Sequence, residues 1–218
     1  MPNISPLAQI HSDHPAVAPP SEWVTRWAYL IDQNCADVNT ESTVLDLACG
    51  SGRHMKWLRE QGFKVLGVDR DAEALELCRP FGEVLQADLE YSTELSSHSS
   101  RATKNPDSLW PLGKRQFNAI IVTNYLWRPL IASILDALKL NGVLIYETFA
   151  QGHQTLGRPR RAEFLLNPGE LIQICTNLHI VAYEQVLLTS PERFVQRIVA
   201  IRAENEVLSP SRYRSTSR

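Results

Sequence analysis

Residues Thr43 to His54 read TVLDLACGSGRH. A short apolar run ends beside an acid, Asp46, and a loop that contains Gly50 and Gly52 follows it. Glycines at a strand-to-helix turn let the backbone bend tightly, and the helix that follows offers its unpaired N–H groups to a ligand. The stretch therefore predicts a cofactor-binding loop between a strand and a helix.

The glycine spacing indicates which cofactor this loop binds. A dinucleotide-binding loop has the pattern G-x-G-x-x-G, whose third glycine lets the helix pack closely on the strand. In this chain Met55 occupies the third place, and the first acid stands inside the strand end. The stretch instead resembles motif I of the class I S-adenosylmethionine-dependent methyltransferases, which commonly reads D-L-A/G-C/x-G-x-G, and the chain is similar to the small bacterial tellurite-resistance and thiopurine-type enzymes. The resemblance implies S-adenosyl-L-methionine as the cofactor.

Two further acids stand where the next two expected strands end. Asp69 closes the run KVLGVD, and Asp88 follows the run EVLQA. An acid about 20 residues beyond a glycine loop can bind both ribose hydroxyls, and the resemblance implies that Asp88 accepts a hydrogen bond from the adenine amino group. A single aspartate at a strand end is more often a turn or helix cap, whereas three in succession favour a cofactor site. The predicted cofactor-binding residues are Asp46, Ala48, Gly50, Gly52, His54, Asp69, Arg70, Asp88, Leu89 and Asn124.

Apolar runs alternate with helical patterns along the chain, which is typical of a parallel sheet with helices on both faces. Strands are expected at 44–48, 65–68, 84–87, 117–122 and 143–149, and helices from Ser21 and at 53–61, 72–79, 129–140 and 168–176. Two β-rich runs at 179–188 and 194–202 predict a closing antiparallel hairpin, and the resemblance implies one reversed strand there. The predicted fold class is α/β, a Rossmann-like doubly wound, mostly parallel seven-stranded sheet with a C-terminal antiparallel hairpin.

The composition along the chain predicts one domain with polar extensions. Residues 1–20 are rich in proline and polar side chains and are expected to form an extended arm, and the polar residues 204–218 a flexible tail. Between them, 21–203 is predicted to be the methyltransferase domain, with a serine-rich insertion or long surface loop at 91–116.

The overall composition is that of an ordinary globular protein, with 44% hydrophobic and 21% charged residues among 218. A net charge of −2 creates no field that would attract nucleic acid or an anionic membrane. No apolar run reaches the roughly 18 residues of a membrane span, and the first residues do not resemble a signal peptide, so we expect no membrane partner and a cytoplasmic location. Four cysteines without a C-x-x-C pair indicate neither a metal site nor a disulfide framework.

The methyl acceptor should meet the loops that follow the fourth and fifth expected strands, because ligands of open α/β sheets lie beyond the carboxyl ends of the strands. Side chains there can position a polar acceptor or carry a proton. The predicted catalytic residues are Asn124, Tyr125, Glu147 and His153.

Three further side chains near these loops are predicted to bind substrate by stacking or by charge: Trp127, Arg128 and Arg158. Burial of the indole in the core and capping of a loop by the guanidinium explain Trp127 and Arg128 equally well. The connection 152–167 is long, holds two glycines and three arginines, and is a lid candidate.

These patterns predict an S-adenosylmethionine-dependent methyltransferase that acts on a small molecule. Displacement at a sulfonium depends on alignment in a water-poor pocket, which can supply roughly 7–11 kcal/mol, more than on a strong base. Arginines at 158–161 and in the tail leave an RNA methyltransferase as an alternative, and a non-catalytic module that binds S-adenosylmethionine is another. The sequence names neither the methylated atom nor the oligomeric state.

Overall fold

The computed structural model describes residues 18–33, 43–90 and 110–203. The helices are α1 (Glu22–Trp27), α2 (Tyr29–Gln33), α3 (Arg53–Glu60), α4 (Ala72–Cys78), α5 (Ile131–Asp136) and α6 (Glu170–Ile174). The strands are β1 (Thr43–Leu47), β2 (Lys64–Asp69), β3 (Glu83–Gln86), β4 (Phe117–Thr123), β5 (Leu138–Phe149), β6 (His179–Thr189) and β7 (Glu192–Ile201). Nearly all of the predicted arm and the whole predicted tail lie outside the described residues.

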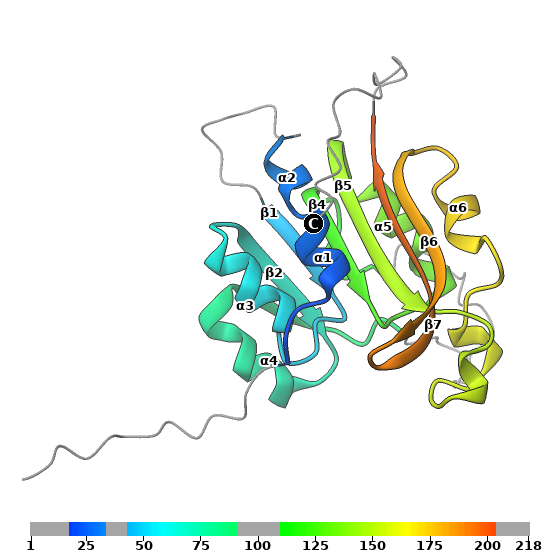
Figure 1. The fold of residues 1–218 in the computed structure, drawn as a ribbon. Coiled ribbons are helices and arrows are strands. Elements are labelled where there is room, and N and C mark those ends of the chain that lie inside the picture. The colour runs from blue at the N-terminus through cyan, green and yellow to red at the C-terminus, as the bar shows by residue number, and fades with distance from the viewer. Residues whose placement is uncertain (1–17, 34–42, 91–109, 204–218) are drawn as a thin grey trace, which may run out of the picture.

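The strands of the described residues form one seven-stranded sheet in the order β3-β2-β1-β4-β5-β7-β6 (Figure 1). The first five strands of this order pair in parallel, whereas β7 is antiparallel to both β5 and β6. This arrangement confirms the predicted fold class, including the closing hairpin. The carboxyl ends of the parallel strands meet at one edge of the sheet, and β7 begins at that same edge because it runs in the opposite direction.

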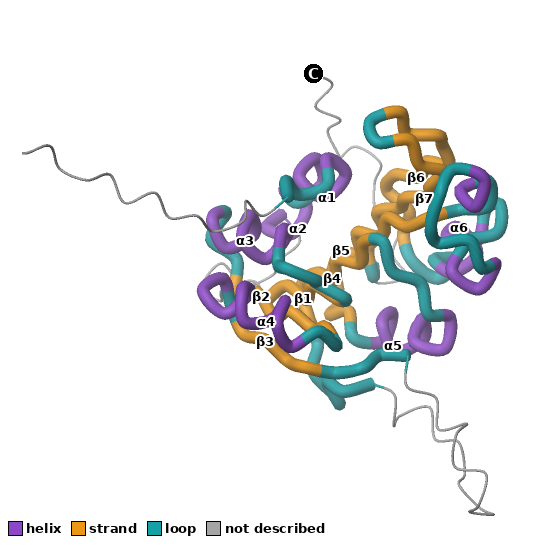
Figure 2. The backbone as a smooth tube through the Cα atoms, turned by 90° about the horizontal axis from the view of Figure 1, so that it is seen from below, coloured by secondary structure: helices purple, strands orange, loops and turns teal. Residues whose placement is uncertain are grey.

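Helices cover both faces of the sheet (Figure 2). Side chains of α1, α2, α3 and α4 join one buried cluster, and those of α5 and α6 join the other. Successive side chains of a strand point to opposite faces, so in β1 Val44 contributes to the first cluster, while Leu45 and Leu47 contribute to the second. The alternation explains why strands that are buried on both faces are apolar almost throughout.

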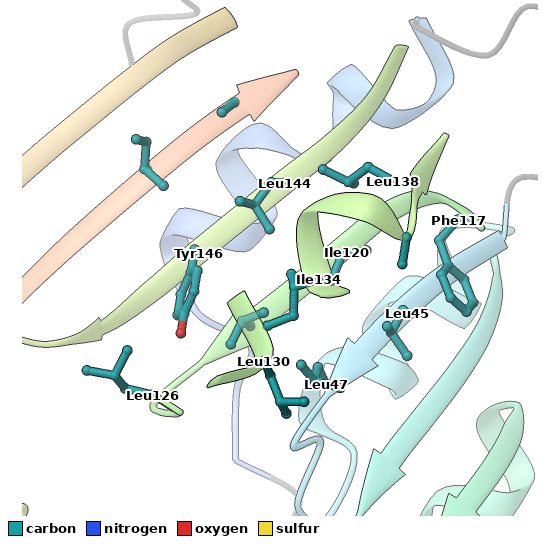
Figure 3. Packing of buried hydrophobic residues seen from close by; sticks show 14 of the residues in the cluster. Leu45, Leu47, Phe117, Ile120, Leu126, Leu130, Ile134, Leu138, Leu144 and Tyr146 are labelled. Atoms are coloured by element: carbon teal, nitrogen blue, oxygen red, sulfur yellow. The ribbon is translucent and has the colours of Figure 1, made fainter. Parts of the chain in front are cut away.

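The second cluster supports the loops at the carboxyl edge (Figure 3). Leu47, Ile120 and Tyr146 come from three neighbouring strands, and Ile134 of α5 packs over them. Burial of one such aliphatic side chain contributes about 1.5–3 kcal/mol. The Tyr146 hydroxyl also donates a hydrogen bond to the Tyr125 carbonyl at 3.0 Å, which ties β5 to the loop after β4.

The predicted helix at 129–140 is wrong in its second half. α5 ends at Asp136, and β5 already begins at Leu138, which is fully buried and pairs with Phe117 of β4. Asn141 then adopts a left-handed backbone with φ 62° inside an irregular stretch of the strand. The apolar residues at 137–140 fit a helix as well as a strand, so periodicity alone could not separate the two.

Two other expectations need correction. Trp110 and Leu112, at the end of the predicted surface insertion 91–116, are buried in the second cluster, while residues 91–109 lie outside the described part of the chain. The predicted helix at 168–176 is limited to the single turn of α6. The helix predicted from Ser21 is confirmed, and the Ser21 hydroxyl accepts the Trp23 N–H as its cap.

Candidate active site

The loop after β1 has the backbone that a tight strand-to-helix turn requires. Gly50 and Gly52 take φ values of 52° and 78°, and Gly52 stands at the N-cap of α3. A side chain at Gly52 would come within 2.7 Å of the Cys78 Sγ, so packing as well as conformation requires glycine there. A side chain at Gly50 would meet nothing within 4 Å, because this part of the loop faces open space. The loop therefore leaves room for a ligand beside its backbone.

Asp69 holds this loop in place from the end of β2. One oxygen of its carboxylate accepts the Gly50 N–H at 2.8 Å, and the other accepts the Asp71 N–H at 3.0 Å. A carboxylate has about four acceptor positions, so further donors can still reach it. The predicted binding of ribose hydroxyls is compatible with this geometry and stays a prediction.

A pocket of about 250 Å³ opens beside Asp69. It gathers predicted cofactor residues from the ends of β1, β2 and β3, and Tyr125 closes it from the loop after β4. Its lining consists of Ala48, Asp69, Arg70, Ala87, Asp88, Leu89, Glu90 and Tyr125. Ligands of open α/β sheets bind at this edge. A larger pocket, of about 430 Å³, lies at the opposite ends of β1 and β2, away from every predicted site residue.

Two residues at this edge have a left-handed backbone without being glycine. Ala48 follows β1 with φ 56°, and Asn124 follows β4 with φ 55°. Such conformations are uncommon outside glycine and concentrate at functional sites. The Tyr125 hydroxyl, next to Asn124, is buried without a hydrogen-bond partner among the described residues, and burial raises its pKa. The structure thus places Tyr125, predicted as catalytic, among the predicted cofactor-binding residues.

Together with Glu147, Asp46 is one of two deeply buried acids of the site. Neither of its carboxylate oxygens has a hydrogen-bond partner among the described residues, and the side chain is 1% exposed. Burial raises the pKa of this carboxyl from 3.8 to about 7, while the positive charge of Arg53 and the nearby backbone N–H of Met55 oppose the rise. An unpaired buried carboxylate is costly. Such a carboxylate is expected in a site whose ligand brings its own hydrogen-bond donors.

His54 connects Asp46 to the first helix. Its Nε2 accepts the backbone N–H of Ser21 at 3.1 Å, which places the ring proton on Nδ1, 3.9 Å from Asp46 Oδ1. Burial lowers the pKa of His54 to about 3, and the adjacent Arg53 lowers it further, so the ring is neutral at physiological pH. Neutral His54 therefore positions Ser21 and faces Asp46 without adding charge.

Glu147 lies at the end of β5 and is 1% exposed. The Ser21 hydroxyl donates to its Oε1 at 3.1 Å, and two guanidinium groups of β7 approach it, Arg193 at 3.6 Å and Arg197 at 3.5 Å. Arg197 lies directly across from Glu147 in the β5–β7 ladder and also pairs with Glu184 at 2.8 Å through Nε. The carboxylate of Glu147 thus joins the first helix to the closing hairpin.

Sequence reasoning missed four residues of this arrangement: Ser21, Arg53, Arg193 and Arg197. The sequence carried one usable signal, since Arg197 interrupts the apolar run of β7 and charged residues inside buried strands are rare unless they are paired. The contacts of Arg193 and Arg197 with Glu147 depend on how the hairpin pairs with β5.

One of the predicted substrate residues, Arg128, holds the connection 152–167 in place. Arg128 forms two hydrogen bonds with the Glu170 carboxylate, at 2.7 and 2.9 Å, and donates to the carbonyls of Glu163 and Leu165. These contacts use most of its donors, which disfavours the predicted substrate role. Trp127 is half-buried against the second cluster, and its Nε1 has no hydrogen-bond partner among the described residues, so its substrate role stays a prediction.

His153 is buried in the same connection and does not face the cofactor pocket. Its ring packs on Phe149 at 4.3 Å between centroids, and its Nε2 lies 2.9 Å from the Arg158 carbonyl. Arg158 itself is exposed. The catalytic role of His153 and the substrate role of Arg158 stay predictions.

The donors and acceptors at the carboxyl edge fit S-adenosylmethionine. Asp69 and Asp88 offer carboxylates to hydroxyl and amino groups, open space faces Gly50, and Asp46 provides an unpaired buried acceptor. In the described part of the chain, no three His, Cys, Asp or Glu side chains come together as a possible metal site, and no helix is long and apolar enough to cross a membrane.

Comparisons with known proteins identify the family of the chain. The model of the "Methyltransferase domain" family matches residues 22–181. A search of curated proteins gave no match.

Solved structures share the fold at low sequence identity. TehB from Haemophilus influenzae superposes with a TM-score of 0.56 at 14% identity over 80% of this chain, which spans 61% of that protein's chain. An S-adenosylmethionine-dependent methyltransferase from Mesorhizobium loti gives a TM-score of 0.56 at 16% identity, over 81% of this chain and 97% of that one. A TehB-like methyltransferase from Corynebacterium glutamicum gives 0.50 at 19% identity, over 79% and 85%. Because the family model covers most of the sequence, the chain belongs to the methyltransferase-domain family and is an S-adenosylmethionine-dependent methyltransferase.

Proposed function

We propose that this enzyme transfers the methyl group of S-adenosylmethionine to a small molecule. The observation that carries the proposal is the enclosure of Glu147, which is 1% exposed although it lies at the open edge of the sheet. Ser21 covers it from the start of α1, and Arg193 and Arg197 cover it from β7. The part of the site that would receive the methyl acceptor is thus covered by α1 and β7. Such a cover favours a compact substrate over a polymer.

The cofactor side would be held by the acids that end the first three strands. Asp69 would bind the ribose hydroxyls and Asp88 with Leu89 the adenine, while Asp46 would face the methionine portion from below the loop. The bound cofactor supplies an electrophilic methyl group on a positive sulfonium. The pocket residues then have to fix its direction, since alignment contributes most of the rate in such a displacement.

The acceptor side would be shaped by Asn124 and Glu147. Asn124 carries its side chain on a left-handed backbone at the end of β4, where the Arg193 guanidinium donates to its Oδ1 at 3.4 Å. The Glu147 oxygens are shared among Ser21, Arg193 and Arg197. We therefore assign Glu147 to holding these side chains in place rather than to proton transfer.

Incubation with a fractionated cell extract tests the proposal. The enzyme and methyl-labelled S-adenosylmethionine are added to separate fractions of small molecules, protein and nucleic acid, with Asp69→Ala enzyme as the control. Label in the small-molecule fraction supports the proposal. Label in RNA supports an RNA methyltransferase, the alternative that the exposed Arg158 and Arg160 favour. Cofactor binding without turnover on any fraction supports a non-catalytic module.

A further inference from the structure

Arg53 is a guanidinium without a partner at the centre of the site. It is the first residue of α3, directly after the cofactor loop, and it is partly buried. Among the described residues, no hydrogen bond or ion pair reaches its side chain. Guanidinium groups that lose water without gaining acceptors are costly, and partial burial lowers the pKa of Arg53. The side chain is therefore placed for an acceptor that the chain itself does not provide.

Arg193 approaches the same place from the hairpin. Its side chain is 19% exposed, and its Nε is buried with no hydrogen-bond partner among the residues that the structure describes. Its other nitrogens reach only long contacts, 3.4 Å to Asn124 Oδ1 and 3.6 Å to Glu147 Oε1. Arg193 thus has an unused donor and two weak contacts, although guanidinium groups bind carboxylates best through two short parallel hydrogen bonds.

The charges around these two arginines do not balance. Arg53 and Arg193 lie close enough for their positive charges to repel, and both act on Glu147. Glu147 is also near Arg197, which pairs with Glu184 and Glu22 as well, so those two acids serve Arg197 rather than Arg53 or Arg193. Asp46, whose pKa burial raises to about 7, is only partly charged at neutral pH. A sulfonium in this site adds a further positive charge, so one more anion would relieve the repulsion.

The geometry points to a small anionic acceptor whose carboxylate or phosphate is bound jointly by Arg53 and Arg193. This inference rests on the proposed function, since it names the class of its substrate. Arg193 contacts Asn124 and Glu147, at the ends of β4 and β5, so the anion would lie on the acceptor side. Arg53 follows the cofactor loop as the first residue of α3, and its charge acts on Glu147 and Arg193. An oxyanion between them would occupy the unused donors of both guanidinium groups.

Anion exchange before the reaction tests the inference. The small-molecule extract is separated into retained and unretained fractions, and each is incubated with enzyme and labelled S-adenosylmethionine, with and without prior phosphatase treatment. We expect label only with the retained fraction, and phosphatase sensitivity would identify phosphate rather than carboxylate. Label only with the unretained fraction would overturn the inference and leave the proposed function intact, whereas label only in RNA would remove the proposed function as well.

Charge-neutral variants assign the binding to the two arginines. Arg53→Gln and Arg193→Gln should each raise the KM for the retained fraction about 10- to 100-fold, as expected for loss of charged hydrogen bonds. Arg59→Gln removes one exposed charge from the same helix, α3, and should leave this KM unchanged. The two positions lie on different elements, so misfolding of one variant leaves the other as a test. Unchanged KM in a folded Arg53 or Arg193 variant would overturn the inference.

The two arginines could instead bind the carboxylate on the methionine portion of the cofactor. Measurements of cofactor affinity distinguish this possibility from binding of the acceptor. Calorimetry compares S-adenosylhomocysteine with 5′-methylthioadenosine, which lacks the amino acid portion. If the arginines bind the acceptor, both variants should bind both ligands within about twofold of the wild-type affinity. A tenfold loss for S-adenosylhomocysteine alone would assign Arg53 and Arg193 to the cofactor and overturn the inference.

Discussion

The sheet edge has a cofactor side, around Asp69 and Gly50, and an acceptor side, around Glu147 and Asn124. The hydrogen bonds within each side join residues at different separations along the chain. On the cofactor side, Asp69 bonds to Gly50, 19 residues away, and to Asp71, two residues away. On the acceptor side, Ser21 bonds to Glu147 across 126 residues, and Arg193 to Asn124 across 69. The cofactor side is therefore almost a local structure, whereas the acceptor side exists only once the sheet is complete.

This difference predicts how each side responds to change. Substitutions on the cofactor side should alter cofactor affinity and leave the hairpin and α1 in place. Substitutions on the acceptor side should affect stability and turnover together, because each side chain there joins distant elements. The largest expected effect is that of the Asp46 charge on the free energy of unfolding.

Asp46→Asn should stabilise the cofactor-free protein at pH 8 by up to about 4 kcal/mol, the equivalent of a rise of roughly three pKa units. The folded-state pKa of Asp46 is about 7, above its usual 3.8, so the folded protein keeps a proton that the unfolded chain has already lost. The resulting stabilisation of the wild type is complete below about pH 4 and is lost as the pH rises through 7. The advantage of the variant should grow over the same range.

Denaturant unfolding from pH 4 to pH 8 measures this effect, with Asp136→Asn as the exposed control. A stability difference that does not change with pH would show that burial of the Asp46 charge has no cost.

Asp69→Ala should weaken S-adenosylhomocysteine binding by roughly 2–4 kcal/mol, because hydroxyl donors lose a charged acceptor and the Gly50 loop loses its anchor. Calorimetry measures the affinity, and Glu73→Ala, an exposed acid on the following helix, is the control. Full affinity in a folded Asp69→Ala protein would contradict the ribose assignment. NAD should bind neither protein.

Ser21→Ala should lower the free energy of unfolding by about 1–2 kcal/mol, because the helix cap and the hydrogen bond to Glu147 are lost together. Turnover should fall while cofactor affinity changes little, since Ser21 does not line the pocket beside Asp69 and its bond to His54 comes from the backbone N–H, which the variant keeps. Ser21→Thr keeps the hydroxyl and is the matched control. Equal unfolding curves for the two variants would contradict the acceptor-side role of Ser21.

Arg158→Ala should change stability by less than about 0.5 kcal/mol, because the side chain is exposed. If the connection 152–167 closes over substrate, the variant should nevertheless turn over more slowly with unchanged cofactor affinity. Amide exchange in this connection should slow when S-adenosylhomocysteine and substrate are bound together. Identical exchange in free and bound protein, with full activity of the variant, would reduce the connection to a rigid support held by Arg128.

Particular residues show how far the sequence allowed prediction. The glycine loop and the acids at 69 and 88 were found from motif spacing, and the structure brings both acids and Ala48, at the start of that loop, to one pocket. Arg128 was ambiguous because a guanidinium on a loop suits either an anion or neighbouring carbonyls, and only the folded connection provides Glu170 and those carbonyls. The helix at 129–140 failed because Leu138 fits both periodicities, and pairing with Phe117 decided in favour of the strand.

The sequence by itself determined the cofactor side, because a tight turn requires glycine at fixed places and a parallel sheet delivers successive strand ends to one edge. Only the tertiary structure decided the acceptor side. Glu147 and Arg197 become neighbours because β7 returns antiparallel beside β5, and Ser21 reaches Glu147 because α1 packs against β5 on one face of the sheet (Figure 1). No local sequence pattern predicts these contacts, since they depend on which distant elements pack together when the complete sheet forms.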